Sequence, residues 1–404
     1  MDLAGKKIVL GLTGGIACYK AAEFTRALIK AGASVQVVMT TAATHFMTPV
    51  TMQGLSGKPV FTDQWDARIG NNMPHIDLTR DADAIVIAPC SADFMSKLAH
   101  GACDDLLSTL CVARPATVPL LIAPAMNVEM WQNPATQRNA NQLLADGIQL
   151  LGPDAGEQAC GEVGMGRMLE ADQLLAEVIA AFQLKLLKGK RVLLTAGPTF
   201  EPIDPVRGIT NLSSGKMGYA VARAAYEAGA EVTLVSGPTA LATPYGVRRI
   251  SVQTAQQMHD IVMAQLTAQS ASSATDIFVA VAAVADWRVA NASTQKLKKN
   301  ADGSAPELVF EQNPDILATV AALPKPPYCV GFAAESEKLL QYGEAKRARK
   351  NVPLLVGNIG HDTFGKDDNQ LVLFDANGHT DLPRAGKQQL ARQLIAAIAA
   401  RLGA

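Results

Sequence analysis

The sequence predicts an α/β protein with two doubly wound, Rossmann-like domains built on mainly parallel sheets. Two observations predict this fold. The chain has 404 residues, more than a single hydrophobic core usually holds. It also repeats one local pattern at residues 6–40 and 191–236, namely an apolar run, a glycine-rich loop, a segment of helical spacing and a second apolar run. Each copy is therefore expected to begin a domain of its own.

Composition narrows the class of protein. Hydrophobic residues make up 49% of the chain, enough for two cores, and the formal net charge of -1 gives no electrostatic reason to expect nucleic acid or an anionic membrane as a partner. None of the six cysteines forms a C-x-x-C pair, which argues against a zinc ribbon or a thioredoxin-type site. The apolar run at residues 277–285 is too short to span a bilayer, and the N-terminus does not read as a signal peptide. We therefore expect a cytoplasmic protein.

The N-terminal half alternates predicted strands and helices, as a parallel sheet covered by helices does. Residues 44–73 are expected to be irregular or to form short helices. Residues 184–190 read as the junction between the halves, which gives domains 1–188 and 189–404. The predicted strands are residues 6–12, 34–40, 83–88, 119–123 and 147–153, and the predicted helices begin near residues 16, 97, 101 and 174.

Small or polar residues follow the first four of these strands, where ligands collect in open α/β sheets. The sequence Thr-Gly-Gly-Ile at 13–16 could hold a phosphate at a helix N-terminus or form a plain turn. It is not G-x-G-x-x-G, so a dinucleotide is not indicated. Thr40 and Ser91 offer hydroxyls at two further strand ends. Asn127, after the fourth strand, could bind a substrate carboxylate or cap a helix, and its position alone favours the cap.

Two more residues of the N-terminal half carry possible chemistry. His75 is a lone histidine, a residue type that is more often structural or simply exposed than catalytic. Cys160 lies among four glycines in residues 154–168, a composition that favours a mobile lid over a packed turn. The thiol is therefore expected to be exposed and usable as a proton donor.

These residues together resemble the flavin-dependent cysteine decarboxylases. The motifs TGGI, His75, PAMN at 124–127, and ACG followed by G-x-G-R-M at 159–168 occur in that family's order. The resemblance implies an FMN cofactor that takes a hydride from the carbon bearing the substrate thiol, so that a thioaldehyde can accept the electrons left by CO₂. It also implies that His75 is the base, that Asn127 holds the substrate carboxylate and that Cys160 protonates the enethiol. The candidate FMN contacts are Gly14, Gly15, Thr40, Ser91 and Ser108.

The C-terminal half shows the same alternation. A continuous apolar strand of the parallel type is expected at 276–285, a last central strand at 352–358 and an edge strand at 371–375. Asn313 is the expected cap of one helix, and Lys387 begins the C-terminal helix. The remaining predicted elements are strands at 191–195, 231–236, 247–252 and 328–334 and helices at 215–229 and 344–351.

Three segments of this half indicate a site for a charged ligand. The loop after residue 195 is longer than an ordinary strand-to-helix turn and ends in Ser-Ser-Gly-Lys at 213–216, but it is not a Walker A loop. Asp286 follows a strand, and could contact a nucleotide, sit near its metal ion or cap a helix. The lysines of residues 295–300 are either a solvated face or a phosphate contact.

The C-terminal half resembles the phosphopantothenate–cysteine ligases. The motifs TAGPT-x-E-x-x-D-P-V-R, NLSSGKMG, AAVADWR, KLKK, NPDIL, VGFAAE and KRARKN occur in that family's order. The resemblance implies that 4′-phosphopantothenate is joined to L-cysteine with CTP and Mg²⁺, through an acyl-cytidylate on which Asn211 acts. The implied CTP contacts are Ala280, Val281, Ala282, Asp286, Lys296, Asn313, Pro314, Asp315, Ile316, Phe332, Lys346 and Lys350.

Both halves in this order resemble the bacterial bifunctional enzymes of coenzyme A synthesis. The C-terminal half would then act first, and the N-terminal half would decarboxylate its product to 4′-phosphopantetheine. The resemblance also implies a homo-oligomer, with trimers of the N-terminal domain joined by dimers of the C-terminal domain. A non-catalytic flavin-binding regulatory protein is disfavoured by the joint presence of His75, Asn127 and Cys160. A tandem dinucleotide oxidoreductase is disfavoured because neither loop is G-x-G-x-x-G.

Overall fold

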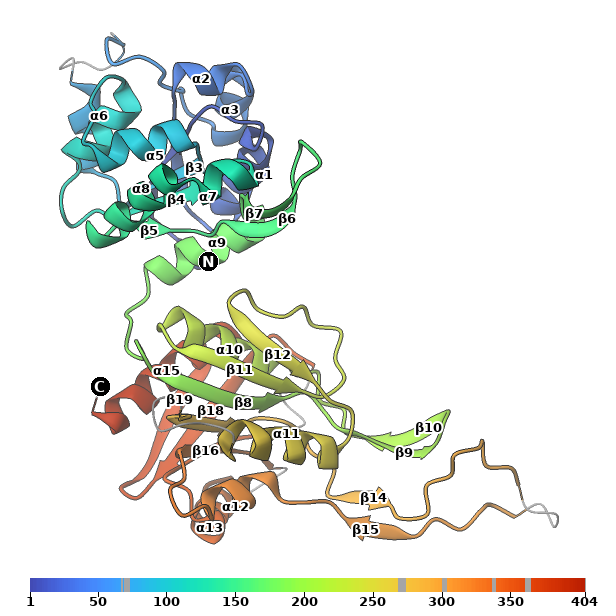
Figure 1. The fold of residues 1–404 in the computed structure, drawn as a ribbon. Coiled ribbons are helices and arrows are strands. Elements are labelled where there is room, and N and C mark those ends of the chain that lie inside the picture. Colours follow the sequence, from blue (N-terminus) through green and yellow to red (C-terminus); the bar gives the residue numbers. More distant parts are fainter. Residues whose placement is uncertain are drawn as a thin grey trace. The chain divides into compact units, whose positions relative to one another are not determined.

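A computed structural model describes residues 1–66, 68, 73–267, 274–299, 304–335, 339–359 and 365–403. They form two compact units, Met1–Phe182 and Gln183–Ala404 (Figure 1). The sequence placed the division a few residues later, between residues 188 and 189. No helix in the described part of the chain combines the length and apolar character that a membrane crossing needs.

The first unit is built on a parallel five-stranded sheet with the order β2-β1-β3-β4-β5. From β1 the chain passes to β2 on one side and then crosses to β3 on the other side, where β4 and β5 follow. This is a doubly wound sheet, and its switch point lies between β1 and β3. The strand predicted at 147–153 is reduced to two residues. The strands are β1 Lys7–Leu12, β2 Ser34–Met39, β3 Ala84–Cys90, β4 Leu120–Pro124 and β5 Gln149–Leu150.

Helices cover both faces of this sheet because its strands are apolar on both faces. Val9 and Ile85 share a core with Phe94 of α5 and Leu107 of α6, whereas the alternate residue Leu10 is fully buried on the opposite face. The helices are α1 Cys18–Lys30, α2 Thr41–Thr44, α3 Pro49–Ser56, α4 Pro74–Arg80, α5 Ala92–Ala99, α6 Leu106–Ala113, α7 Val128–Gln132, α8 Pro134–Ala145 and α9 Ala171–Ala181.

The glycine-rich segment predicted as a lid forms a two-stranded antiparallel hairpin. Its strands are β6 Asp154–Glu157 and β7 Val163–Arg167, and Cys160 lies in the turn between them. In Figure 1 the hairpin extends from the side of the unit near α1 and α7.

The second unit contains a sheet of order β12-β11-β8-β13-β16-β17-β18-β19, parallel from β12 to β17 and antiparallel beyond. The prediction of an edge strand at 371–375 was wrong, because β18 lies between β17 and β19. The edge strand β19 is largely exposed and polar, so it shows no apolar run in the sequence. The strands are β8 Arg191–Ala196, β11 Glu231–Ser236, β12 Val247–Ser251, β13 Ile277–Ala280, β16 Tyr328–Glu335, β17 Leu354–Ile359, β18 Asp368–Asp375 and β19 Gly378–Gly386.

The apolar run at 276–285 is only partly a strand. β13 ends at Ala280, and the following residues leave the sheet. Their backbone groups bond instead to the loop after β8, where Ala283 N donates to Gly197 O at 2.9 Å and Thr199 N donates to Ala283 O at 3.2 Å. The apolar residues continue beyond the end of β13 because they form one wall of a cleft in this unit.

Helices also cover both faces of the second sheet (Figure 1). Those on one face are α10 Lys216–Glu227 and α15 Lys387–Leu402, and those on the other include α11 Ala255–Thr267 and α12 Ile316–Ala321. Helix α13 Leu339–Lys350 packs beside β17, and two hairpins project from the unit, β9 Phe200–Asp204 with β10 Arg207–Thr210 and β14 Trp287–Val289 with β15 Phe310–Gln312.

One predicted helix cap was wrong, and one of the alternatives left open for Asp286 is excluded. Helix α12 is capped by Asp315, whose Oδ1 accepts from Ala318 N at 3.0 Å, and not by Asn313. Asn313 instead donates from Nδ2 to Ala285 O at 2.8 Å, which ties the two sides of a cleft together. Asp286 precedes strand β14, so the alternative in which it caps a helix is excluded.

Candidate functional site

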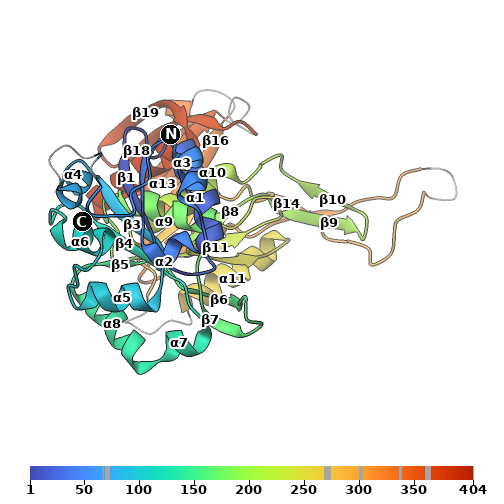
Figure 2. The same ribbon diagram turned by 90° about the horizontal axis from the view of Figure 1, so that it is seen from above.

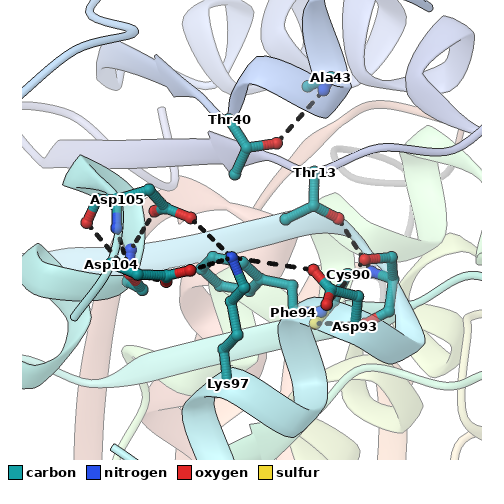
Figure 3. Close-up of polar contacts among 11 residues, drawn as sticks. Thr13, Thr40, Ala43, Cys90, Asp93, Phe94, Lys97, Asp104 and Asp105 are labelled. Carbon is teal, nitrogen blue, oxygen red and sulfur yellow. Dashed lines mark hydrogen bonds and ion pairs between the residues drawn. The ribbon is translucent and has the colours of Figure 1, made fainter. Parts of the chain in front are cut away.

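Four of the five predicted FMN contacts of the first unit lie at the carboxyl ends of its strands, namely Gly14, Gly15, Thr40 and Ser91. One threonine joins β1 to β3 at this edge of the sheet. Thr13 Oγ1 donates to Pro89 O at 2.8 Å and accepts from Ser91 N at 2.9 Å (Figure 3). The bond pair fixes the loop after β1 against the loop after β3. Open α/β sheets bind their ligands at this switch point.

The hydroxyls of Thr40 and Ser91 both cap helices. Thr40 Oγ1 accepts from Ala43 N at 3.2 Å (Figure 3), and Ser91 Oγ accepts from Phe94 N at 3.2 Å. Each hydroxyl keeps its own hydrogen to donate. Both side chains can therefore serve as donors to a ligand without giving up the caps.

The glycine loop after β1 has room for an anionic group. A Cβ on Gly14 would lie 2.6 Å from Ala42 Cβ, so only glycine allows this approach to α2, whereas a Cβ on Gly15 would meet no described atom within 4 Å. No described side chain caps the first turn of α1. The N–H groups of Cys18, Tyr19 and Lys20 donate to the carbonyls of Gly15, Ile16 and Ala17, so the backbone of this turn closes the start of α1. The helix dipole and the open space beside Gly15 suit a phosphate, so this loop fits the phosphate of FMN.

Ser108 has a different environment from the other four candidates. It is fully buried and closes a capping box at the start of α6, in which Ser108 N donates to Asp105 Oδ1 at 2.8 Å and Ser108 Oγ accepts from Asp105 N at 3.2 Å. Lys97 secures the same turn, with Nζ 2.9 Å from Asp104 and 3.3 Å from Asp105 (Figure 3). The hydrogen bond with Asp104 raises the pKa of Lys97. Ser108 thus offers no exposed hydroxyl within this chain.

Asn127 and Cys160 are brought together through Glu162, which was not predicted from the sequence. Asn127 Oδ1 accepts from Met130 N at 3.0 Å, which confirms the predicted cap. Its Nδ2 donates to Glu162 Oε2 at 3.1 Å, and the same oxygen lies 3.4 Å from Cys160 Sγ. Cys160 is exposed, as expected. The sequence feature that could have identified Glu162 is a glutamate two residues after the cysteine of a glycine-rich segment.

The hairpin that carries Cys160 is anchored at its root. Met126 N donates to Gly166 O at 3.0 Å, and a Cβ on Gly166 would lie 2.5 Å from Met126 O. The nearly buried Lys20 donates from Nζ to Met168 O at 2.9 Å and to Glu170 at 2.8 Å. These contacts bind the root to α1 and to the end of β4, and Gln158 Oε1, which accepts from Val128 N at 3.0 Å, holds the hairpin against α7 nearer the turn.

His75 does not join this group. It lies on α4, and Figure 2 shows α4 beside α6, away from β6 and β7. Among the described residues, no hydrogen bond joins its ring to Asn127 or Cys160. The first unit of one chain therefore gathers two of its three predicted catalytic residues.

In the second unit, a cleft of about 600 Å³ opens at the carboxyl ends of β8, β13 and β16. All the predicted CTP contacts line it except Lys296, and so does Asn211, which donates from Nδ2 to Ala283 O at 2.9 Å. Lys296 lies in the segment between β14 and β15 and is not among the described lining residues. The topology thus collects residues from five separate segments of the sequence in one cavity.

Positive groups occupy two walls of the cleft. One wall is the start of α10, where Gly215 has φ +77° and no described side chain caps the helix. The other wall carries Lys346 and Lys350 of α13. Burial lowers the pKa of Lys350, and this outweighs the charge of Asp286; Lys350 also pairs with Asp315. The cleft therefore suits a polyanion more than a neutral ligand.

Lys387 lines the same cleft but was not predicted as a site residue. It is the first residue of α15 and is 8% exposed. Burial, followed by the charge of Lys216, lowers its pKa. A lysine in the first turn of a helix is disfavoured by the helix dipole. This unfavourable position is the sequence feature that could have identified Lys387 as a site residue.

Comparison with known proteins agrees with the division into two units. The family described as "Flavoprotein" matches residues 1–183, and that described as "DNA/pantothenate metabolism flavoprotein C-terminal domain" matches residues 187–402. The chain is 49% identical to the coenzyme A biosynthesis bifunctional protein CoaBC of Vibrio cholerae over 98% of both chains. It is 45% identical to that of Escherichia coli strain K12, over 99% of this chain and 98% of the relative, and 41% identical to that of Bacillus subtilis, over 98% of both.

The lowered pKa of Lys350 predicts how binding in the cleft responds to pH. A lysine is charged below its pKa, so Lys350 loses its charge at a lower pH than an ordinary lysine does. We expect the affinity for CTP to fall between neutral pH and about pH 10, and the Lys350→Arg variant to reduce that fall because arginine stays charged. Calorimetric titration with CTP measures both curves.

The matched control is Lys325→Arg, an exposed lysine outside the cleft lining, which should follow the wild-type curve. Identical pH dependence in the wild type and the Lys350 variant would show that this ammonium does not face the ligand.

Proposed function

The chain belongs to the family of coenzyme A biosynthesis bifunctional proteins, and we propose that its first unit holds FMN and its second unit CTP. It is a bifunctional enzyme. The first unit is a phosphopantothenoylcysteine decarboxylase, and the second is a phosphopantothenate–cysteine ligase. The observation that carries the assignment of a nucleoside triphosphate is the convergence of lysines from α13 and the uncapped start of α10 on one cleft. The choice of CTP rests on the resemblance to the phosphopantothenate–cysteine ligases.

The ligase reaction requires activation of a carboxylate, because its oxygen is a poor leaving group. Attack of the carboxylate of 4′-phosphopantothenate on the α-phosphate of CTP gives the acyl-cytidylate and pyrophosphate. The cysteine amine then attacks the acyl carbon, and CMP leaves. Lys346 and Lys350 offset the negative charge on the phosphates. Asn211 stands at the cleft wall with its amide fixed by Ala283 O, which supports a role in orienting the intermediate.

The CTP phosphates would themselves supply much of the Mg²⁺ coordination. No cluster of three metal-ligating side chains was found among the described residues. Mg²⁺ commonly takes one or two carboxylates together with substrate phosphates and water. Asp286 and Asp315 line the cleft and are the candidates to complete such a shell.

The decarboxylase reaction needs an electron sink, and FMN, when bound at the β1 and β3 switch point, supplies reversible hydride acceptance. The protein's own residues bind the substrate and place the groups that donate and accept protons. Asn127 points its amide toward the Cys160 hairpin and binds the substrate carboxylate. Cys160 gives its thiol proton to the enethiol that remains after CO₂ departs. His75 removes the proton that starts the sequence.

The separation of His75 from Asn127 and Cys160 supports a homo-oligomer in which neighbouring copies complete each decarboxylase site. A trimer of first units would place His75 of one copy beside the hairpin of the next. The second unit exposes apolar side chains on its projecting hairpins, with Trp287 55% and Phe310 52% exposed, which supports pairing of second units into dimers. Bacterial relatives named for coenzyme A biosynthesis support a cytoplasmic location.

The Cys160→Ser variant should stop 4′-phosphopantetheine formation while ligation continues. A serine hydroxyl is too weak an acid to protonate the enethiol, so that species should accumulate in an amount close to that of the flavin. Mass spectrometry of the products measures it. Cys103→Ser, also an exposed cysteine, is the control and should behave as wild type. Normal production of 4′-phosphopantetheine by the Cys160 variant would remove this residue from its proposed role.

The Asn211→Asp variant should abolish coupling of phosphopantothenate to cysteine and leave decarboxylation intact. A carboxylate in this place would repel the phosphates of the acyl-cytidylate. The assay supplies phosphopantothenoylcysteine to one sample and its precursors to another. Asn377→Asp, in an exposed turn of the same unit, should retain both activities. Loss of both activities in the Asn211 variant would mean that the two units do not act separately.

Shared sites predict complementation between two inactive variants. Co-expression of His75→Asn with Cys160→Ser should restore decarboxylation, because some interfaces join the intact His75 of one copy to the intact Cys160 of another. A working site needs His75 from a Cys160→Ser copy and Cys160 from a neighbouring His75→Asn copy. If the two variants assemble at random into closed rings, about a quarter of the wild-type number of sites will be complete. Turnover per flavin measures this fraction. No restored turnover, with mixed oligomers demonstrated by two affinity tags, would place all three residues in one chain's site.

A further inference from the structure

Glu162 occupies the position that the proposed mechanism assigns to the substrate carboxylate. Its Oε2 accepts a hydrogen bond from Asn127 Nδ2 at 3.1 Å and lies 3.4 Å from Cys160 Sγ. The turn that presents it is closed by hydrogen bonds from Gln158 N to Glu162 O at 2.8 Å and from Gly161 N to Gln158 O at 2.9 Å. One carboxylate oxygen therefore faces both the amide and the thiol.

The orientation of the Asn127 amide is fixed independently of Glu162. Met130 N can only donate, so the atom that accepts from it at 3.0 Å must be the asparagine oxygen. The NH₂ group is thereby turned toward the hairpin. A substrate carboxylate that reached this NH₂ group would stand next to the carboxylate of Glu162. Two like charges at that separation repel, so the two carboxylates exchange and do not share the amide.

We propose that Glu162 is an internal substitute for the substrate carboxylate, held on Asn127 while the site is empty and displaced when phosphopantothenoylcysteine binds. This inference rests on the proposed role of Asn127. The product has lost its carboxyl group as CO₂ and cannot compete for the amide. Glu162 then returns to Asn127, and the hairpin resumes its empty-site contacts. Glu162 is thus a positioning residue that weakens substrate binding but does not weaken product binding.

The Glu162→Gln variant tests this exchange. Glutamine keeps the shape and an acceptor oxygen but forms a neutral hydrogen bond, which is roughly half as strong as a charged one. We expect KM for phosphopantothenoylcysteine to fall about three- to tenfold. The inhibition constant of 4′-phosphopantetheine should stay at the wild-type value. A purely structural contact would change both constants in the same direction, so the ratio of the two constants is the decisive readout.

Two further variants sharpen the test. Glu157→Gln alters an exposed carboxylate on the same hairpin and should leave both constants unchanged. Glu162→Asp keeps the charge on a shorter side chain, and its KM should lie between those of the wild type and the glutamine variant. Steady-state decarboxylation with product inhibition provides all the constants.

The outcomes separate this inference from the function on which it rests. Decarboxylation by the wild type, with KM unchanged or raised in Glu162→Gln, would overturn the inference alone. A parallel fall in KM and in the product inhibition constant would also overturn it. Absence of decarboxylation by the FMN-loaded wild type would overturn the proposed function and the inference together.

Discussion

Both sites depend on one geometric constraint, that parallel strands bring their carboxyl ends to the same edge of a sheet. In the first unit, Thr13 fixes this edge by bonding the end of β1 to the end of β3. In the second unit, Asn211 and Asn313 hold the site together in a similar way, because each donates a hydrogen bond to a carbonyl of the segment that follows β13. Residues that are distant in the sequence meet only because these strand ends are held together.

The two edges offer different chemical groups to an anionic ligand. The first unit offers a glycine loop, an uncapped helix start and two hydroxyls that already serve as helix caps. Such neutral donors suit a single phosphate and an aromatic ring system. The second unit combines the lysines of α13 with the uncapped start of α10 in one cleft, which suits a triphosphate. The same fold class therefore supports a redox cofactor in one unit and an activated acid in the other.

Much of this arrangement could be predicted from the sequence, because buried parallel strands are apolar runs and their loops carry the site residues. The failures have local causes. Strand β19 is exposed and polar, and residues 281–285 are apolar because they line a cleft. The cap of α12 was wrongly assigned to Asn313. Asn313 and Asp315 are both residue types that cap helices, and the sequence alone does not distinguish them. Glu162 was missed because its role depends on the approach of a hairpin to α7, and the distance of His75 from Cys160 depends on tertiary structure alone.

The most direct measurement follows CO₂ from L-cysteine labelled in its carboxyl carbon, supplied to the purified FMN-loaded protein with 4′-phosphopantothenate and either CTP or ATP. The account predicts labelled CO₂ only when the acid and the nucleotide are both present, and much faster release with CTP. It also predicts FMN in the supernatant after denaturation. Release of CO₂ from cysteine alone, or a protein that neither contains nor takes up FMN, would contradict the account.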